Sequence, residues 1–193
     1  MLIRSFRNDK GVAALELSLI LPVLLVLVFA IIDFGLLTHA RLILANIARE
    51  GGNLASRDIK AGNDLIKMLQ TSANPLKLQE DGRICISSIE AGTPNNHDPA
   101  ISGTDPPVCA GSLAAPSSIS AGAANLGLTQ KVYDHLVFNS GNKASDINGV
   151  TVVETFYKYR PITPLPKFIT NILLNDGDGI IINSRAAFCT TGG

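Results

Sequence analysis

Residues 10–32 read KGVAALELSLILPVLLVLVFAII, and this stretch decides the fold. The 21 residues from Val12 to Ile32 contain a single charged side chain, that of Glu16. As an α-helix they would extend for about 31 Å at ~1.5 Å per residue, which matches a hydrocarbon core of roughly 30 Å. We therefore expect a membrane-spanning helix with one carboxylate near its entrance.

The charges around this run differ between its two ends. Residues 1–10 hold three basic residues against one acidic residue, and no charge follows Glu16 until Asp33. By the positive-inside rule the N-terminus stays cytoplasmic and the chain beyond residue 33 is exported. A cleaved secretory signal fits less well, because its apolar region has about 7–15 residues and a small-x-small site follows. Residues 31–35, IIDFG, offer no such site.

The helical pattern continues beyond the apolar run. Apolar residues recur at three- and four-residue spacing as far as about Ser56, with polar residues between them. Pro22 lies inside the apolar part and should kink or loosen the helix there, which membrane helices tolerate. Gly51 and Gly52 favour a close-packing surface on the amphipathic part, although they could also form a flexible point.

The remaining sequence predicts a small α+β domain with a roughly three-stranded antiparallel sheet. The division is a leader at 1–11, a transmembrane half of the helix at 12–33, its amphipathic continuation at 34–57, and an exported head at 58–193. We expect strands at 83–89, 150–160 and 180–189, and helices at 63–72, 120–139 and 167–174. Val150, Val152 and Phe156 should share one strand face, opposite Val153, Tyr157 and Tyr159. Residues 92–118 read as a long surface loop, and 175–179 as a turn.

Three cysteines lie in the part that we expect to be exported. An oxidising compartment permits one disulfide and leaves one cysteine over. Cys85 with Cys109 is the preferred pair, because it encloses a loop rich in Pro and Gly, and Cys189 with either of them remains open.

The sequence gives no pattern for catalysis, for a metal or cofactor, or for nucleic acid. The 16 Lys and Arg residues balance the 16 Asp and Glu residues, which excludes a strongly basic nucleic-acid-binding surface in bulk. His39, His97 and His135 are scattered, without Ser-His-Asp order or zinc-ligand spacing. In the turn at Asp176, isoleucines stand where a calcium loop needs oxygen ligands. We expect a protein that is not an enzyme.

Gly11 and Glu16 stand five residues apart at the start of the run. A glycine before a peptide bond lets an extended backbone lie close in a peptidase groove, because it has no Cβ. Cleavage after Gly11 would make Val12 the new N-terminus, with its cationic amine one helical turn from Glu16. Such a pair, within one chain or between subunits, lowers the cost of a carboxylate in the bilayer. The alternative is that Glu16 only marks the membrane boundary and reaches lipid headgroups.

Residues 10–22, KGVAALELSLILP, resemble the start of TadE-like pseudopilins of Tad (tight adherence) type IVc pili. Residues 33–35 (DFG) and 48–52 (AREGG) resemble the continuation of that family, and 156–166 (FYKYRPITPLP) its C-terminal strand and prolines. Leu17 departs from the family pattern, in which an aromatic residue often follows the glutamate. The resemblance implies that a prepilin peptidase cleaves after Gly11, and that Glu16 is the pilin-type glutamate.

The resemblance also implies location, partners and role. The chain would sit in the bacterial inner membrane with its C-terminal domain outside, and could enter the extracellular pilus. Its partners would be other pilins and pseudopilins, the prepilin peptidase and the inner-membrane pilus assembly platform. We expect a structural or initiating minor pilin in which Glu16 sets helix register. Two alternatives remain: an uncleaved single-pass assembly factor, and an anchored adhesin or enzyme without a recognisable site.

Overall fold

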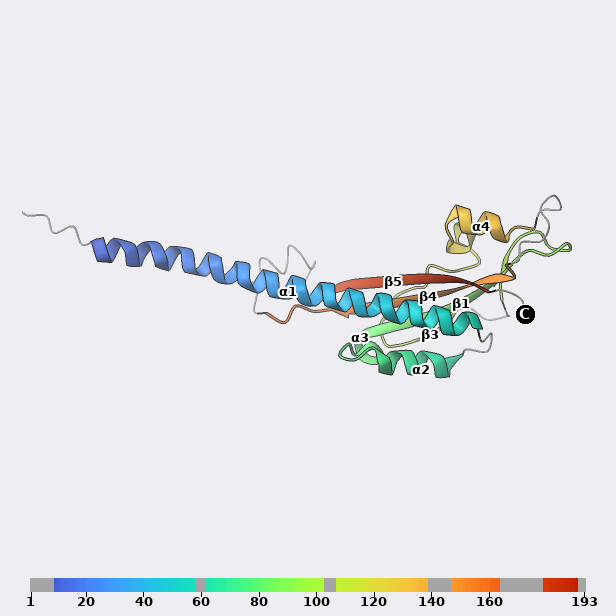
Figure 1. Ribbon diagram of the computed structural model, residues 1–193, viewed down its shortest axis with the longest axis horizontal. Helices are drawn as coiled ribbons and strands as arrows, with labels where there is room; N and C mark the ends of the chain where they lie inside the picture. The colour runs from blue at the N-terminus through green and yellow to red at the C-terminus, as the bar shows by residue number, and fades with distance from the viewer. Residues whose placement is uncertain (1–8, 58–61, 103–106, 139–146, 164–178, 191–193) are drawn as a thin grey trace, which may run out of the picture. The chain divides into compact units, whose positions relative to one another are not determined.

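The computed structural model describes residues 9–57, 62–102, 107–138, 147–163 and 179–190. The fold is α+β: one long helix, α1 (Asp9–Arg57), packs on an antiparallel sheet (Figure 1). The chain forms two compact units, Met1–Thr38 with Arg160–Gly179 and His39–Tyr159 with Ile180–Gly193. Helix α1 has 49 residues, or about 74 Å at ~1.5 Å per residue. The predicted continuation of the apolar helix to about Ser56 is confirmed.

The described residues contribute five strands to one sheet. Its order is β2-β1-β4-β5, with β3 also paired to β1, and every pairing is antiparallel. The strands are β1 (Gly82–Glu90), β2 (Ala100–Ile101), β3 (Val108–Ala110), β4 (Gly149–Tyr159) and β5 (Ile180–Thr190). Strands β1, β4 and β5 are the three that the sequence predicts, each within one residue of the expected bounds.

The segment 92–118 is not the structureless loop that the sequence predicts. It contributes β2 and β3, which have two and three residues and both pair with β1. Such short strands leave no periodic pattern in a segment rich in Gly and Pro. They form by pairing with β1, so the residues of the segment itself carry little periodic signal.

The helices of the second unit agree only in part with the prediction. Helix α2 (Asn63–Ser72) has the predicted bounds, and a short helix α3 (Leu78–Asp81) was not predicted. The helix expected over 120–139 is wrong: α4 covers only Gln130–Leu136, after a 3-10 turn at Ala124–Gly127. Asn125 and Leu126 have φ of 52° and 55° in that turn, which an α-helix does not allow. The helix expected over 167–174 and most of the turn at 175–179 lie outside the described residues.

Strand β4 forms the centre of the core and is buried over nearly its whole length, because both faces of the sheet are covered. On one face Val150 and Val152 pack with Ile89 and with residues of the 113–138 segment, and Phe156 packs beside Cys85. On the other face Val153 lies against α1. The predicted alternation of the strand is confirmed.

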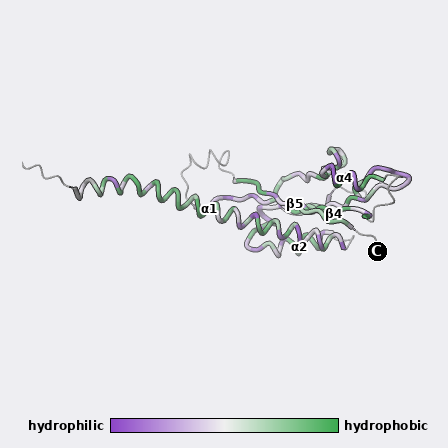
Figure 2. The backbone as a smooth tube through the Cα atoms, turned by 45° about the horizontal axis from the view of Figure 1, so that its top comes forward, coloured by the Kyte–Doolittle hydropathy of each residue, from purple (hydrophilic) through white to green (hydrophobic). Residues whose placement is uncertain are grey.

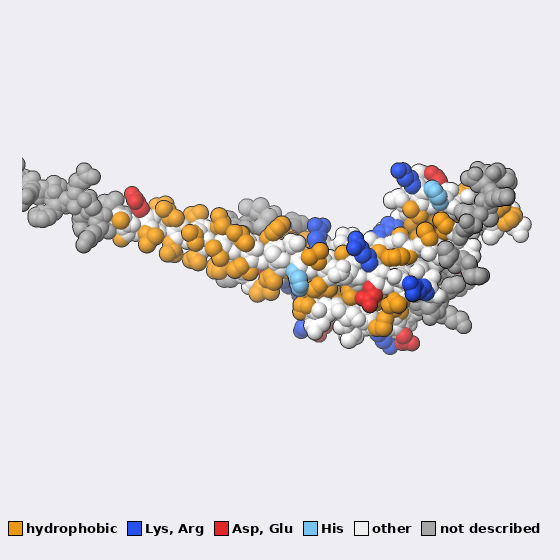
Figure 3. Space-filling model, viewed as in Figure 1, with side chains coloured by type: hydrophobic (Ala, Val, Ile, Leu, Met, Phe, Trp, Pro, Cys, Tyr) orange, Lys and Arg blue, Asp and Glu red, His pale blue; other side chains and the backbone are white. Residues whose placement is uncertain are grey.

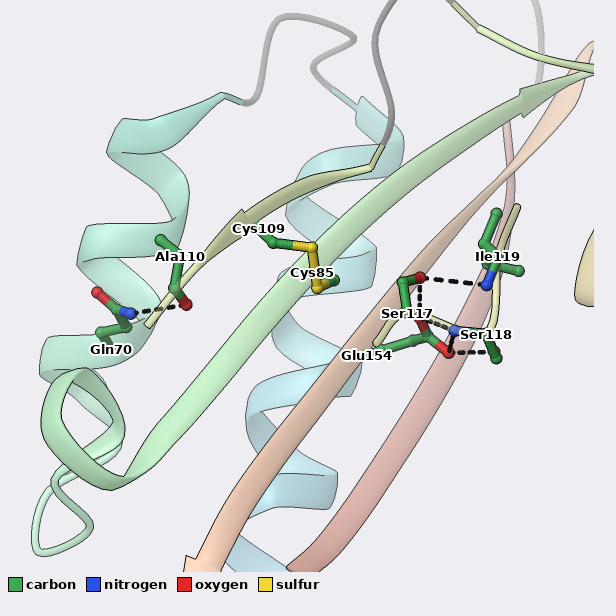
Figure 4. The surroundings of a disulfide bond; sticks show 8 residues. All are labelled: Gln70, Cys85, Cys109, Ala110, Ser117, Ser118, Ile119 and Glu154. Atoms are coloured by element: carbon green, nitrogen blue, oxygen red, sulfur yellow. Dashed lines mark hydrogen bonds between the residues drawn. A yellow bond between two sulfur atoms is a disulfide. The ribbon is translucent and has the colours of Figure 1, made fainter. Parts of the chain in front are cut away.

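A disulfide fixes β3 to β1, and it joins the preferred pair, Cys85 and Cys109 (Figure 4). The two residues lie directly opposite each other in the antiparallel register. The amide of Gln70 on α2 adds a second link to β3 by donating to the carbonyl oxygen of Ala110 at 3.1 Å. Cys189, on β5, is free and exposed.

Glu154 is a buried carboxylate on the same sheet face as Cys85, and it holds a loop on the sheet (Figure 4). It accepts hydrogen bonds from the hydroxyls of Ser117 and Ser118, and the Ser118 backbone N–H donates to it at 3.1 Å. Arg185, its register partner on β5, donates to the Ser118 hydroxyl oxygen at 3.2 Å. A buried carboxylate needs such donors, and their use here is structural.

Replacing Cys85 and Cys109 together with Ala should lower the free energy of unfolding by about 3 kcal/mol, since the bond closes a long loop in the unfolded chain. Denaturant unfolding of the full chain in detergent, followed by circular dichroism, measures the change. Cys189→Ser is the matched control and should unfold like the unaltered protein. Equal losses in the double variant and the control would contradict a stabilising role for the bond.

Candidate functional site

The first part of α1 exposes apolar side chains all around the helix. Figure 2 shows this part as predominantly hydrophobic, and Figure 3 shows hydrophobic side chains covering it. Among the described residues, α1 is the one helix that is long and apolar enough to cross a membrane. The other described residues bury none of its apolar segment. Exposed members include Leu15, Leu17, Leu19, Ile20, Leu24, Leu27, Ile31 and Ile32. A surface of this kind requires lipid or protein to cover it.

Glu16 lies on this apolar part and is exposed. Its side chain has no hydrogen-bond or ion-pair partner within the part of the chain that the structure describes. Gly11 and Val12 also lie in α1, so the backbone is helical on both sides of the bond between them. Val12 and Glu16 are four positions apart, which places them on the same face of a helix. The roles predicted for Gly11, Val12 and Glu16 stay predictions.

Pro22 lies within α1, and the helix neither ends nor restarts there. Proline removes one backbone hydrogen bond and costs roughly 3 kcal/mol in the interior of a helix in water. The predicted kink stays a prediction.

Asp33 ends the apolar run, and the chain itself covers it: only 7% of the residue is exposed. Its carboxylate accepts hydrogen bonds from the backbone N–H of Ile162 at 3.1 Å and of Thr163 at 3.4 Å. The hydroxyl of Thr163 also donates to it. These contacts fasten the segment after β4 to α1, across about 130 residues of sequence. Both segments resemble the family in sequence, but nothing in the sequence predicts that they touch.

The second part of α1 packs closely on the sheet and on α2. A Cβ added at Gly51 would lie 2.6 Å from Cδ1 of Leu69 and 3.4 Å from Cγ1 of Val153. At Gly52 it would lie 2.4 Å from Cδ2 of the Phe188 ring on β5. The predicted close-packing surface is therefore confirmed. The missing side chains let the helix backbone approach the sheet.

The residues that the structure describes form no cluster that could bind a metal ion. No three His, Cys, Asp or Glu side chains among them lie close enough to hold a metal ion. The three histidines lie apart from one another. His39 is on α1, and His135 contacts the Lys131 carbonyl on α4. His97 lies beside Phe138, with the two rings tilted and their centroids 5.7 Å apart. The candidate functional surface is therefore the apolar first part of α1, with Glu16 near its start and Asp33 at its end.

Comparison with known proteins points to the same helix. Residues 11–53 carry a TadE-like protein family domain, which begins at Gly11 and includes Glu16, Pro22 and Asp33. The match covers about a fifth of the chain. Comparisons with curated proteins and with solved structures found no match. The family domain and its apolar helix are consistent with a membrane-anchored protein of a Tad pilus.

Gly52→Ala should lower the free energy of unfolding by about 1–3 kcal/mol, because the added methyl group displaces the Phe188 ring or the helix. Gly35→Ala is the matched control: its Cβ meets nothing within 4 Å, so it should stabilise the helix by up to ~1 kcal/mol. Thermal unfolding of both full-length variants in the same detergent measures the two changes. A Gly52→Ala variant as stable as Gly35→Ala would refute the close contact.

Proposed function

We propose that the chain is a structural or initiating minor pilin, a pseudopilin, in Tad-type pilus assembly. In this proposal a prepilin peptidase cleaves after Gly11, and Glu16 sets the register of the helix. The observation that carries the proposal is the apolar first part of α1, exposed on all sides, with Glu16 alone charged between Val12 and Ile32. The family domain that begins at Gly11 supports it.

The apolar helix can be covered in two ways, and a pilin needs both. In the precursor, lipid covers Val12–Ile32, which is long enough to cross the hydrocarbon core once. In a filament, helices of neighbouring subunits cover the same side chains. Since lipid and packed protein are similarly apolar, moving from one to the other costs little hydrophobic free energy.

Glu16 supplies the specificity that an apolar helix lacks. A carboxylate at the bilayer centre costs roughly 2.5 kcal/mol or more, and the described chain gives Glu16 no partner. Cleavage after Gly11 creates an amine at Val12, and in the filament Glu16 of one subunit pairs with this amine of a neighbouring subunit. A subunit shifted along the filament would then bury both charges unpaired, at a cost of about 3–5 kcal/mol. The pair therefore favours one axial register.

The second unit would contact other pilins or the inner-membrane assembly platform. Its buried carboxylate is occupied by structural hydrogen bonds, and its disulfide joins two strands. These features fit a stable exported head domain that presents a surface to partners.

One observation favours the uncleaved alternative, a permanent single-pass assembly factor. Helix α1 begins at Asp9, so the Gly11–Val12 bond lies inside the helix. A peptidase generally requires an extended backbone, and the first turn of α1 would have to unwind before cleavage. Among the described residues, Asp9 and Lys10 are the helical residues that precede Gly11. Fraying of a helix end near this point would expose the bond at low cost.

Intact-mass analysis of the protein, purified from membranes of its own cells, distinguishes the processed pilin from the uncleaved assembly factor. We expect a mass that begins at Val12. A protein that keeps Met1 in wild-type cells would exclude the processed pilin and support the assembly factor. Cells lacking the prepilin peptidase should yield the unprocessed mass and serve as the control.

Glu16→Gln should leave membrane insertion intact and reduce incorporation into pili by roughly 100-fold, since an unpaired buried amine costs about 3 kcal/mol or more per subunit. Quantitative immunoblotting of sheared pili against the membrane fraction measures incorporation. Glu50→Gln, an exposed glutamate later in the same helix, is the control and should incorporate normally. Normal incorporation of Glu16→Gln would remove the register role.

A further inference from the structure

The surroundings of Asp33 are unusual for a charged residue at the end of an apolar helix. A carboxylate at the surface of a membrane normally keeps its water. Here three donors from Ile162 and Thr163 take the place of that water, and the residue is 7% exposed. Since a buried carboxylate is stable only when its oxygens are bonded, these contacts hold the segment in place.

The segment that Asp33 holds exposes an apolar side chain, that of Ile162. The backbone N–H of Ile162 donates a hydrogen bond to Asp33, and 76% of the residue is exposed. Phe34, next to Asp33 on the helix, is 70% exposed. Both belong to the same compact unit as the apolar run. Two large apolar side chains are therefore exposed next to Asp33: Phe34 follows it in the helix, and Ile162 is hydrogen-bonded to it through its backbone.

We propose that Asp33 fixes residues 161–163 at the surface of the lipid bilayer, so that Ile162 enters the lipid beside Phe34. This inference rests on the proposed function, in which lipid covers Val12–Ile32. Lipid is the occupant because the exposed side chains continue the surface of the run that lipid covers.

The second contact gives the anchor a preferred orientation. A single apolar helix that is exposed on all sides can tilt in any direction in lipid without favouring one of them. An additional apolar side chain held beside one face removes that freedom, because tilt toward the opposite side would lift Ile162 out of the lipid. Asp33 acts here as a positioning residue, since its hydrogen bonds hold the segment that carries Ile162.

The chain contains no Trp, so a single introduced Trp reports its own depth. Ile162→Trp is placed in the full chain, in vesicles of phosphatidylcholine and phosphatidylglycerol with acyl chains brominated near the headgroup. We expect its fluorescence to be quenched. Adding Asp33→Ala should reduce that quenching to the level of Ile181→Trp, an exposed isoleucine on β5. Thr163→Ala, which removes one donor, should give an intermediate value.

Leu24→Trp, in the middle of the apolar run, separates the two proposals. If lipid brominated deeper along its chains does not quench the Leu24→Trp variant, the membrane anchor itself is wrong. If that variant is quenched and Ile162→Trp is not, the anchor stands and the second contact is refuted. Protection of the Ile162→Trp indole from both brominated lipid and aqueous iodide would show that protein covers it, and would also overturn the proposal. Quenching of Ile162→Trp that Asp33→Ala leaves unchanged would refute the role of Asp33.

Discussion

The apolar surface of the first part of α1 has to be kept out of water, and the arrangement of the chain follows from that constraint. Most side chains from Leu15 to Ile32 are exposed, and the other residues that the structure describes do not cover them. The same helix then changes character. From Ala40 onward its buried side chains face the sheet, and Gly51 and Gly52 let it approach closely. One helix thus combines an exposed apolar surface with a part that belongs to a conventional protein core.

Local patterns in the sequence predicted the parts of the fold that local physics determines. The apolar run, the helix Asn63–Ser72 and strands β1, β4 and β5 all carry strong periodicity, and they form as expected. The sequence pattern gave wrong predictions where the structure depends on strand pairing or on unusual backbone geometry. Strands β2 and β3 exist because β1 offers them a partner, and the turn at Asn125 and Leu126 breaks a segment that reads as helical.

Contacts between residues far apart in the sequence also could not be predicted from local patterns. Glu16 and Gly11 stand out by type and spacing within six residues. The partner of Asp33 lies some 130 positions away, and nothing local marks Thr163 as a donor. Glu16 and Asp33 therefore differ: hydrogen-bond donors of the same chain contact the Asp33 carboxylate, whereas Glu16 has no partner among the described residues.

The disulfide between β1 and β3 also implies an order for export and folding. Thiols stay reduced in the cytoplasm, so in a chain exported as we propose the Cys85–Cys109 bond forms only after both residues have crossed the membrane. Until then the short strand β3 is held by a few backbone hydrogen bonds and by Gln70. The head is consequently at its least stable while it still has to be threaded outward. It becomes resistant to unfolding on the side where it is needed.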